Sequence, residues 1–191
     1  MRNEILNEIK ESIKVKENII NSTKLLDDIK NLAEEIIKTL KNNGKIIFFG
    51  NGGSFADAQH LTAEFISKLR VDRNPIPALA LGTNSSNLTA IANDYGYEKV
   101  FIRELQALAN SNDLLIPIST SGNSKNIISA IEYANSKSLN TIGLTGENGG
   151  NMSKICKVIK VPSRVTEKIQ ESHIMIGHIV CHICENTLFV N

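Results

Sequence analysis

The chain of 191 residues is poor in cysteine, in net charge and in long apolar runs, and each shortage excludes a class of protein. Three cysteines are an odd number for a disulfide framework, and the N-terminus is charged from Arg2 onward rather than built like a signal peptide. We therefore expect reduced thiols and a cytoplasmic location. Cys181 and Cys184 have CxxC spacing, but they stand in an apolar helical stretch without a second pair, so we interpret them as buried helix residues rather than a zinc or redox site.

The formal net charge is +1, with 21 Lys and Arg against 20 Asp and Glu. Such a balance supplies no general field for nucleic acid or for an anionic membrane, so neither is expected as a partner. No apolar run approaches the length of a membrane span. The length and the 41% hydrophobic content fit a single domain with a sizeable core over residues 1–191, with N-terminal helices over 1–43 and an α/β core with a C-terminal helix over 44–191.

Apolar residues recur at helical spacing over residues 4–40, which predicts two amphipathic helices. The Asn-Ser-Thr sequence at 21–23 is expected to separate them, and Asn-Asn-Gly at 42–44 to end the second. The pair is longer than a cap on a sheet edge requires, and its apolar stripe needs a partner. We expect oligomerisation through these helices.

From residue 44 onward, short apolar runs alternate with helical patterns. Strands are expected at residues 45–49, 77–81, 113–118, 141–144 and 158–161, and helices near 55–69, 87–93, 99–109, 124–136, 152–155 and 166–187. This alternation predicts the α/β class: a doubly wound, flavodoxin-like sheet of five parallel strands, flanked by helices on both faces and joined by right-handed crossovers. Residues 70–77, rich in charge and proline, are interpreted as a surface loop.

Two turns favour a phosphorylated small molecule. Ser-Thr-Ser-Gly-Asn-Ser at 119–124 follows an expected strand and leads into an expected helix, where backbone N–H groups and hydroxyls can donate to an anion. The same residues are also ordinary turn and cap residues, so this motif alone decides nothing. A second turn, Gly-Asn-Gly-Gly-Ser at 50–54, follows another strand, and such turns meet at one edge of a parallel sheet. Neither has the spacing of a dinucleotide fingerprint or a Walker loop.

His60 and Glu64 are four residues apart on one expected helix, so they share a face and could bind one metal ion. An exposed His–Glu pair without a metal is the alternative. The final helix carries His173, His178 and His182, and sequence spacing alone cannot choose among them.

Five motifs follow one another in order along the chain. They are residues 50–54 with Asp57, His60 and Glu64; Ala-Asn-Asp-Tyr-Gly at 92–96; residues 118–124; Leu-Thr-Gly at 144–146 with Gly149 and Gly150; and Ile-Gln-Glu at 169–171 with His173 and His178. Together they resemble the bacterial phosphoheptose isomerases of the sugar isomerase (SIS) superfamily, over nearly the whole chain.

The resemblance implies an isomerase that converts D-sedoheptulose 7-phosphate to D-glycero-D-manno-heptose 7-phosphate through a metal-assisted enediol, the first step of heptose precursor synthesis for lipopolysaccharide or capsule. It also implies a homotetramer with one zinc ion per active site, held by His60, Glu64, Gln170 and His178. Glu64 is the candidate group that transfers the carbon-bound proton, and His178 is the candidate that transfers the protons on the oxygen atoms. The substrate-binding positions that it implies are Asn51, Gly52, Gly53, Glu64, Asn93, Asp94, Ser119, Thr120, Ser121, Ser124 and Gln170.

Gln170 and His178 are eight residues apart, a rise of about 12 Å on one straight helix, which is too far for easy ligation of one ion. Either Gln170 precedes the regular helix or different subunits supply the two residues. We expect the second, with active sites assembled at subunit interfaces. Asn84 stands where many relatives have aspartate, which leaves the substrate contacts of residues 83–86 open.

Two other functions share these features. A non-enzymatic adaptor that associates with the bacterial replication initiator has the same fold and most of the motifs. An isomerase or a sensor for another sugar phosphate would need the same two turns. Both rank below the heptose phosphate isomerase because the order of all five motifs fits that enzyme better.

Overall fold

Five short apolar runs form one parallel sheet with the strand order β2-β1-β3-β4-β5. The computed structural model describes residues 1–190. The strands are β1 (Ile46–Gly50), β2 (Ala78–Ala80), β3 (Leu114–Ile118), β4 (Asn140–Gly146) and β5 (Lys157–Val161). Every residue of β1 and β3 is buried, which explains why they read as continuous apolar runs rather than as alternating patterns. The expected strands are confirmed with boundaries within two residues, and the order is the flavodoxin-like one.

The helices fill the segments between and around the strands. They are α1 (Arg2–Ile20), α2 (Thr23–Lys41), α3 (Gly53–Ile66), α4 (Ser85–Tyr95), α5 (Val100–Leu108), α6 (Lys125–Ser136), α7 (Met152–Ile155) and α8 (Thr166–Glu185), with short helical turns at Tyr97–Lys99 (η1) and Asn186–Val190 (η2). The predicted break between the first two helices is confirmed, and Ser22 caps α2 by accepting a hydrogen bond from the backbone N–H of Leu25 over 3.3 Å.

From residue 44 onward the predicted helix boundaries lie within two residues of the observed ones, except at the end of the helix predicted over 55–69, which was wrong. The helix predicted over 55–69 starts at Gly53 and ends at Ile66, and the guanidinium of Arg73 donates to the carbonyl oxygen of Phe65 over 2.7 Å, in place of a further helical turn. The helix predicted to continue to residue 187 changes to a wider turn after Glu185.

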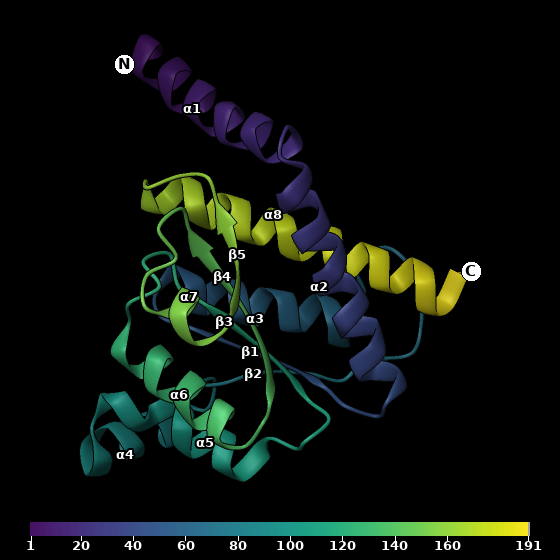
Figure 1. The fold of residues 1–191 in the computed structure, drawn as a ribbon, viewed down its shortest axis with the longest axis vertical. Helices are drawn as coiled ribbons and strands as arrows, with labels where there is room; N and C mark the ends of the chain where they lie inside the picture. The colour runs from purple at the N-terminus through teal and green to yellow at the C-terminus, as the bar shows by residue number, and fades with distance from the viewer. Residues whose placement is uncertain (191) are drawn as a thin grey trace.

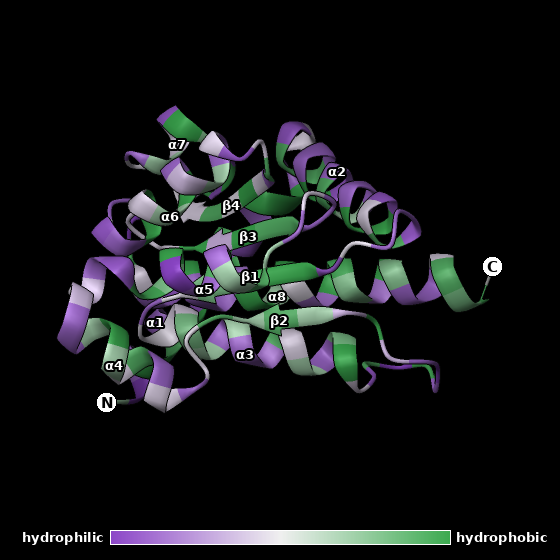
Figure 2. Ribbon diagram, turned by 90° about the horizontal axis from the view of Figure 1, so that it is seen from below, coloured by the Kyte–Doolittle hydropathy of each residue, from purple (hydrophilic) through white to green (hydrophobic). Residues whose placement is uncertain are grey.

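Helices cover both faces of the sheet, as Figures 1 and 2 show. On one face α2, α3 and α8 pack on the strands around Ile36, Phe65 and Ile176. On the other face α5, α6 and α7 enclose a second core that includes Phe101 and Ile131. Figure 1 shows the strands between α8 on one side and α5 and α6 on the other, Figure 2 shows the apolar strands face on, and the predicted doubly wound arrangement is confirmed.

The first helix extends beyond the rest of the fold at the top of Figure 1. It is tied to α8 by ion pairs, from Lys16 to Glu171 at 3.2 Å and from Lys168 to Glu8 at 3.1 Å. Three of its apolar side chains are 50% to 59% exposed, namely Ile5, Ile9 and Ile13. The predicted apolar stripe is therefore present and uncovered in this chain, and its use in oligomerisation stays a prediction.

Residues Thr166–Val190 have the length and apolar composition of a membrane span, which corrects the expectation that no segment approaches one. One face of α8 is buried against α2, α3 and the sheet, with Ile169, Ile176 and Val180 at its centre. Part of the apolar content of α8 thus belongs to the core, while Ile179 and Ile183 are 40% and 36% exposed. Burial raises the pKa of both Cys181 and Cys184 to about 12, as expected for buried thiols rather than reactive ones.

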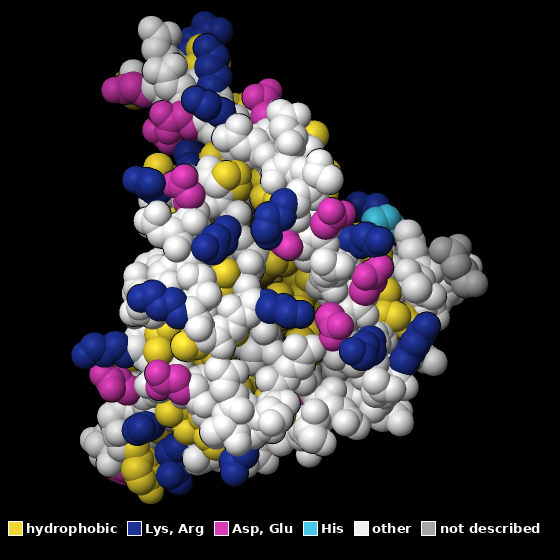
Figure 3. Space-filling view, in the orientation of Figure 1, with side chains coloured by type: hydrophobic (Ala, Val, Ile, Leu, Met, Phe, Trp, Pro, Cys, Tyr) yellow, Lys and Arg dark blue, Asp and Glu magenta, His cyan; other side chains and the backbone are white. Residues whose placement is uncertain are grey.

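The surface charges are mixed in sign, in line with the net charge of +1. Figure 3 shows Lys and Arg interspersed with Asp and Glu over one face of the molecule. Some form ion pairs one helical turn apart, as Lys24 and Asp28 do on α2 at 2.5 Å.

Candidate active site

The two predicted phosphate turns meet at the point where the sheet changes its direction of winding. Strands β1 and β3 are neighbours, yet α3 leaves β1 on one face and α6 leaves β3 on the other. A crevice forms at the carboxyl ends of such strands, and ligands of open α/β sheets bind there. Residues 51–53 and 119–124 directly follow β1 and β3, which confirms their predicted placement on one sheet edge.

The turn after β1 ends at once in α3. Gly52 has φ of +57°, a conformation that favours glycine, and α3 begins at the next residue. Gly53 lies directly against the side chain of Gln170, since a Cβ built on Gly53 would be only 2.4 Å from Gln170 Nε2. Both glycines are exposed, so the N-terminal end of α3 is open to a ligand, with the Gln170 amide beside it.

The loop after β3 brings its hydroxyl groups together. Ser119 Oγ lies 3.4 Å from Ser124 Oγ and accepts a hydrogen bond from Gly122 N over 3.2 Å. Gly122 has φ of +65° and lies against the loop after β4, where a Cβ would be 2.2 Å from the carbonyl oxygen of Gly149. The loop after β4, with Gly149, therefore packs closely against this serine loop, while Ser121 is exposed.

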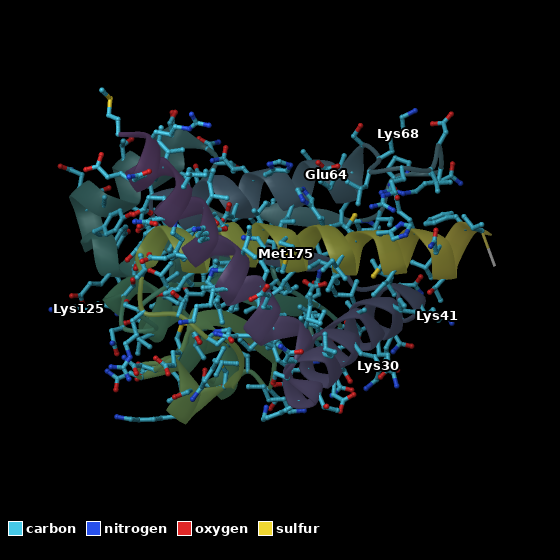
Figure 4. The ribbon with its side chains drawn as sticks, turned by 90° about the horizontal axis from the view of Figure 1, so that it is seen from above. Lys30, Lys41, Glu64, Lys68, Lys125 and Met175 are labelled. Atoms are coloured by element: carbon cyan, nitrogen blue, oxygen red, sulfur yellow. The ribbon has the colours of Figure 1, made fainter. Side chains whose placement is uncertain are left out.

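Three side chains from α3 and α8 converge about two to three helical turns along α3 from the glycine turn. His60 Nε2 lies 3.0 Å from Glu64 Oε1, and His178 Nε2 lies 3.2 Å from His60 Nε2 and 3.9 Å from Glu64 Oε1. Figure 4 places Glu64 on α3 alongside α8. The two helices approach closely at Gly177, where a Cβ would be 2.3 Å from the side chain of Leu61. This close packing is what brings His178 to the predicted His60–Glu64 pair.

The converging atoms fit a divalent cation. Two imidazole nitrogens and one carboxylate oxygen lie within 4.8 Å of one another, and His60 is the most exposed of the three residues. Three nitrogen and oxygen ligands with a solvent-facing side are typical of catalytic zinc sites, which keep a position open for water or substrate.

The other two histidines of α8 have different surroundings. His173 is fully buried with Nε2 3.1 Å from the carbonyl oxygen of Thr145, and burial lowers the pKa of His173 to about 4, so it is a neutral donor in the core. His182 contacts Arg70 at 3.2 Å and Asn186 at 3.3 Å. Neither residue joins the cluster formed by His60, Glu64 and His178.

Gln170 lies apart from this cluster in the chain described here. Because α8 begins at Thr166, Gln170 belongs to the regular helix, and the alternative that it precedes the helix was wrong. Its side chain lies against Gly53, two helical turns before His178. Ligation of one ion by Gln170 and His178 stays a prediction that requires a second subunit.

Asn93 and Asp94 are on α4, which has no buried residue, and the amide of Asn93 donates to Asp94 Oδ1 over 2.8 Å. No hydrogen bond joins either residue to the two turns within residues 1–190. Their contact with substrate stays a prediction. Asn84 is the N-cap of α4, accepting from the backbone N–H groups of Ser86 and Asn87 over 3.0 and 3.1 Å. In this chain Asn84 has a structural role.

Asn126 was missed from the sequence, and Asp57 was named only as part of a motif, without a role. Asn126 forms a reciprocal amide pair with Asn51, and it could have been found as a polar residue on the otherwise apolar buried face of α6. Asp57 lies on α3 one turn before His60, its Oδ2 is buried without a partner among the described residues, and burial raises its pKa to about 6 against the opposing charge of His60.

Comparison with known proteins gives consistent matches over nearly the whole chain. A family model described as the SIS domain matches residues 9–146. A phosphoheptose isomerase from Aneurinibacillus thermoaerophilus is 50% identical over 192 residues, covering 100% of this chain and 97% of the relative. Phosphoheptose isomerase 2 from Campylobacter jejuni is 52% identical over 180 residues, covering 94% and 90%. The solved structure of a phosphoheptose isomerase from Neisseria gonorrhoeae is similar with a TM-score of 0.90 at 38% identity, covering 97% and 98%.

Proposed function

This chain belongs to the SIS domain family and, within it, to the phosphoheptose isomerases, and from that membership we propose that it converts D-sedoheptulose 7-phosphate to D-glycero-D-manno-heptose 7-phosphate. It is an aldose–ketose isomerase. One structural observation carries the assignment of the site: the side chains of His60, Glu64 and His178 converge on α3, where His60 and Glu64 lie about 10 and 17 Å along the helix from the glycine turn at Gly53. We therefore assign proton transfer to this cluster and phosphate binding to the two turns at the carboxyl ends of β1 and β3.

The phosphate is assigned to the loop of residues 119–124 and to the exposed N-terminal end of α3. Hydroxyl groups and helix N-termini donate hydrogen bonds to an anion without a fixed positive charge. Held there, the phosphate anchors the far end of the sugar, and its binding energy orients the reacting carbons at the cluster. We assign contact with the hydroxyl groups of the sugar to the amide of Gln170, which lies against Gly53.

The reaction moves a proton from C1 to C2 of the ketose through an enediol and adjusts the protons on O1 and O2. Glu64 Oε1 faces both histidines, so we assign transfer of the carbon-bound proton to the second carboxylate oxygen, Oε2. His178 is assigned to the oxygen protons. A divalent cation such as zinc, when held by His60, Glu64 and His178, supplies Lewis-acid polarisation of the carbonyl group.

We also propose a homotetramer with active sites at subunit interfaces, a role in heptose precursor synthesis for lipopolysaccharide or capsule, and a cytoplasmic location. The uncovered apolar face of α1 supports the oligomer. The separation of Gln170 from His178 along α8 supports a site completed by a second subunit, which could also contribute Asn93 and Asp94.

Proton NMR of the purified protein with sedoheptulose 7-phosphate tests the proposed function. The wild type should produce the aldose heptose phosphate, while Glu64→Gln and His178→Gln should not. His182→Gln is the matched control, since His182 is one turn further along α8 and contacts Arg70 instead of the cluster. The same assay after chelation and after zinc is restored measures the contribution of the metal.

No conversion by a folded, metal-replete oligomer would contradict the heptose assignment. Binding to a replication initiator without turnover would then favour the adaptor. Turnover of another ketose phosphate in a substrate panel would instead favour an isomerase of different specificity.

A further inference from the structure

The side-chain amide of Asn51, in the turn after β1, is largely occupied by two other residues. Its Nδ2 donates to Asn126 Oδ1 over 2.8 Å, and Asn126 Nδ2 donates back to Asn51 Oδ1 over 2.9 Å. The hydroxyl of Tyr97 donates to the same Oδ1 over 3.0 Å. An amide oxygen has two acceptor positions and an amide nitrogen has two donors, so three of the four hydrogen-bonding positions of Asn51 are taken within the protein.

Asn126 is buried where an apolar residue would ordinarily pack. It is 3% exposed, on the face of α6 that also buries Ile127 and Ala130. A buried amide is tolerated only when it is hydrogen-bonded, and its Oδ1 additionally accepts from the backbone N–H of Ile127 over 3.0 Å. A side chain that is costly to bury and whose side-chain hydrogen bonds to other side chains all go to Asn51 indicates a requirement at that turn.

The three residues join segments that approach the crevice from different directions. Asn51 leads into α3 on one face of the sheet, and Asn126 lies in the first turn of α6 on the other face, directly after the serine loop of residues 119–124. Tyr97 follows α4, which carries residues 93–94. Each of these segments holds predicted substrate-binding residues. The amide pair therefore spans the crevice at the switch point of the sheet.

We infer that Asn126 and Tyr97 are positioning residues for the sugar phosphate, acting through Asn51, an inference that rests on the proposed function. The amide pair holds the glycine turn and the serine loop at one spacing, so that both reach the same phosphate group. Prearranged donors spend no binding energy on ordering themselves when the ligand arrives. The predicted substrate contact of Asn51 then belongs to its backbone and to the glycine turn rather than to its side chain.

A double-mutant cycle with Asn51→Ala and Asn126→Ala tests this inference by steady-state kinetics with sedoheptulose 7-phosphate. Each single variant should raise KM about tenfold and change kcat by less than about twofold, because ground-state and transition-state binding of the phosphate weaken alike. The double variant should be no worse than either single variant, since both break one coupled unit. Asn135→Ala is the matched control on α6, because the amide of Asn135 donates to Ile155 O, away from the crevice.

Tyr97→Phe keeps the test valid if Asn126→Ala does not fold. Tyr97 is 54% exposed, so removal of its hydroxyl leaves the core intact, and KM should rise about threefold in wild type but not in Asn51→Ala. If Asn51→Ala is much more damaging than Asn126→Ala and the two effects multiply in the double variant, the Asn51 side chain contacts the substrate directly and the inference is wrong.

Titration with inorganic phosphate, followed by calorimetry, separates this inference from the proposed function. Weaker phosphate binding by Asn126→Ala, with wild-type affinity in Asn135→Ala, supports the positioning role even if the wild type does not turn over the heptose phosphate. Equal phosphate affinity in wild type and Asn126→Ala would overturn it.

Discussion

Replacement of Glu185 by Gln should destabilise the fold far more than neutralising an acidic residue in an exposed ion pair. Glu185 and Arg73 form an ion pair of 3.1 Å with side chains 0% and 1% exposed. Glu185 also accepts from the backbone N–H groups of Leu69 over 2.9 Å and Arg70 over 3.0 Å, while Arg73 donates to the carbonyl oxygen of Glu64 over 2.8 Å. The pair thus ties the end of α8 to the end of α3.

Loss of one partner leaves the buried guanidinium of Arg73 without its counterion, which typically costs about 3–5 kcal/mol. Neutralising Asp28 in the exposed pair with Lys24 should cost less than about 1 kcal/mol. With a urea dependence of about 2 kcal/mol/M, Glu185→Gln should lower the urea midpoint by about 1.5–2.5 M.

The pH dependence gives an independent check. Burial acts to raise the pKa of Glu185, but hydrogen bonds from the backbone of Leu69 and Arg70 and the charge of Arg73 outweigh it, so the pKa lies below its ordinary value of 4.5. The stabilisation is therefore present above pH 4.5 and is lost as the pH falls through the lower folded-state pKa. The wild type should lose more stability over this range than Glu185→Gln does.

Urea unfolding followed by far-ultraviolet circular dichroism at pH 7 measures these differences, with Asp28→Asn as the exposed control. A double variant, Arg73→Met with Glu185→Met, should recover part of the loss, because apolar side chains can replace a buried pair. A midpoint for Glu185→Gln within about 0.3 M of the control would refute the reasoning.

Three further predictions concern the site and the first helix. Gly53→Ala should leave stability within about 1 kcal/mol of wild type, since alanine favours helices, yet lower kcat/KM about tenfold because the new Cβ meets Gln170 Nε2; equal kinetics would show that Gln170 can move aside without loss. His60→Gln should weaken zinc binding at least about tenfold in competition with a chromogenic chelator, and unchanged affinity would exclude His60 as a ligand. A hydrogen bond from the Ser12 hydroxyl, and to a smaller extent the charges of nearby lysines, lower the pKa of Glu171. The contact of Glu171 with α1 should therefore stabilise α1 above pH 4.5 and be lost as the pH falls below it. Amide hydrogen exchange between pH 5 and 3 should show a loss of protection confined to α1, and a loss spread uniformly over the chain would contradict this.

The elements of the fold were largely predictable because each is a local pattern. The buried strands are continuous apolar runs, and the break between α1 and α2 is marked by Ser22, a residue type that is typical of helix N-caps. Boundaries failed where a distant residue decides them. The end of α3 depends on Arg73, seven residues beyond the last helical residue, and no periodicity within the helix reveals that contact.

The residues of the site were likewise predictable from the sequence only where a local pattern defines them. His60 and Glu64 could be paired from their spacing on one helix, whereas spacing could not single out His178, which was chosen from the family resemblance and is brought to the pair by the packing of α8 against α3 at Gly177. The bond between Asn51 and Asn126 crosses the sheet from one helical layer to the other, so only the tertiary structure shows it.

The separation of His60 and His178 by 118 residues has a consequence for the order of events during synthesis. At roughly 5–20 residues per second, the ribosome needs roughly 6–24 s to add the segment between them. During that interval α3 can carry His60 and Glu64 but has no α8 to cover Leu61 and Phe65. A nascent chain therefore passes through a stage with two of the three cluster residues and an uncovered apolar helix face. Three-residue capture of a cation begins only after α8 has docked.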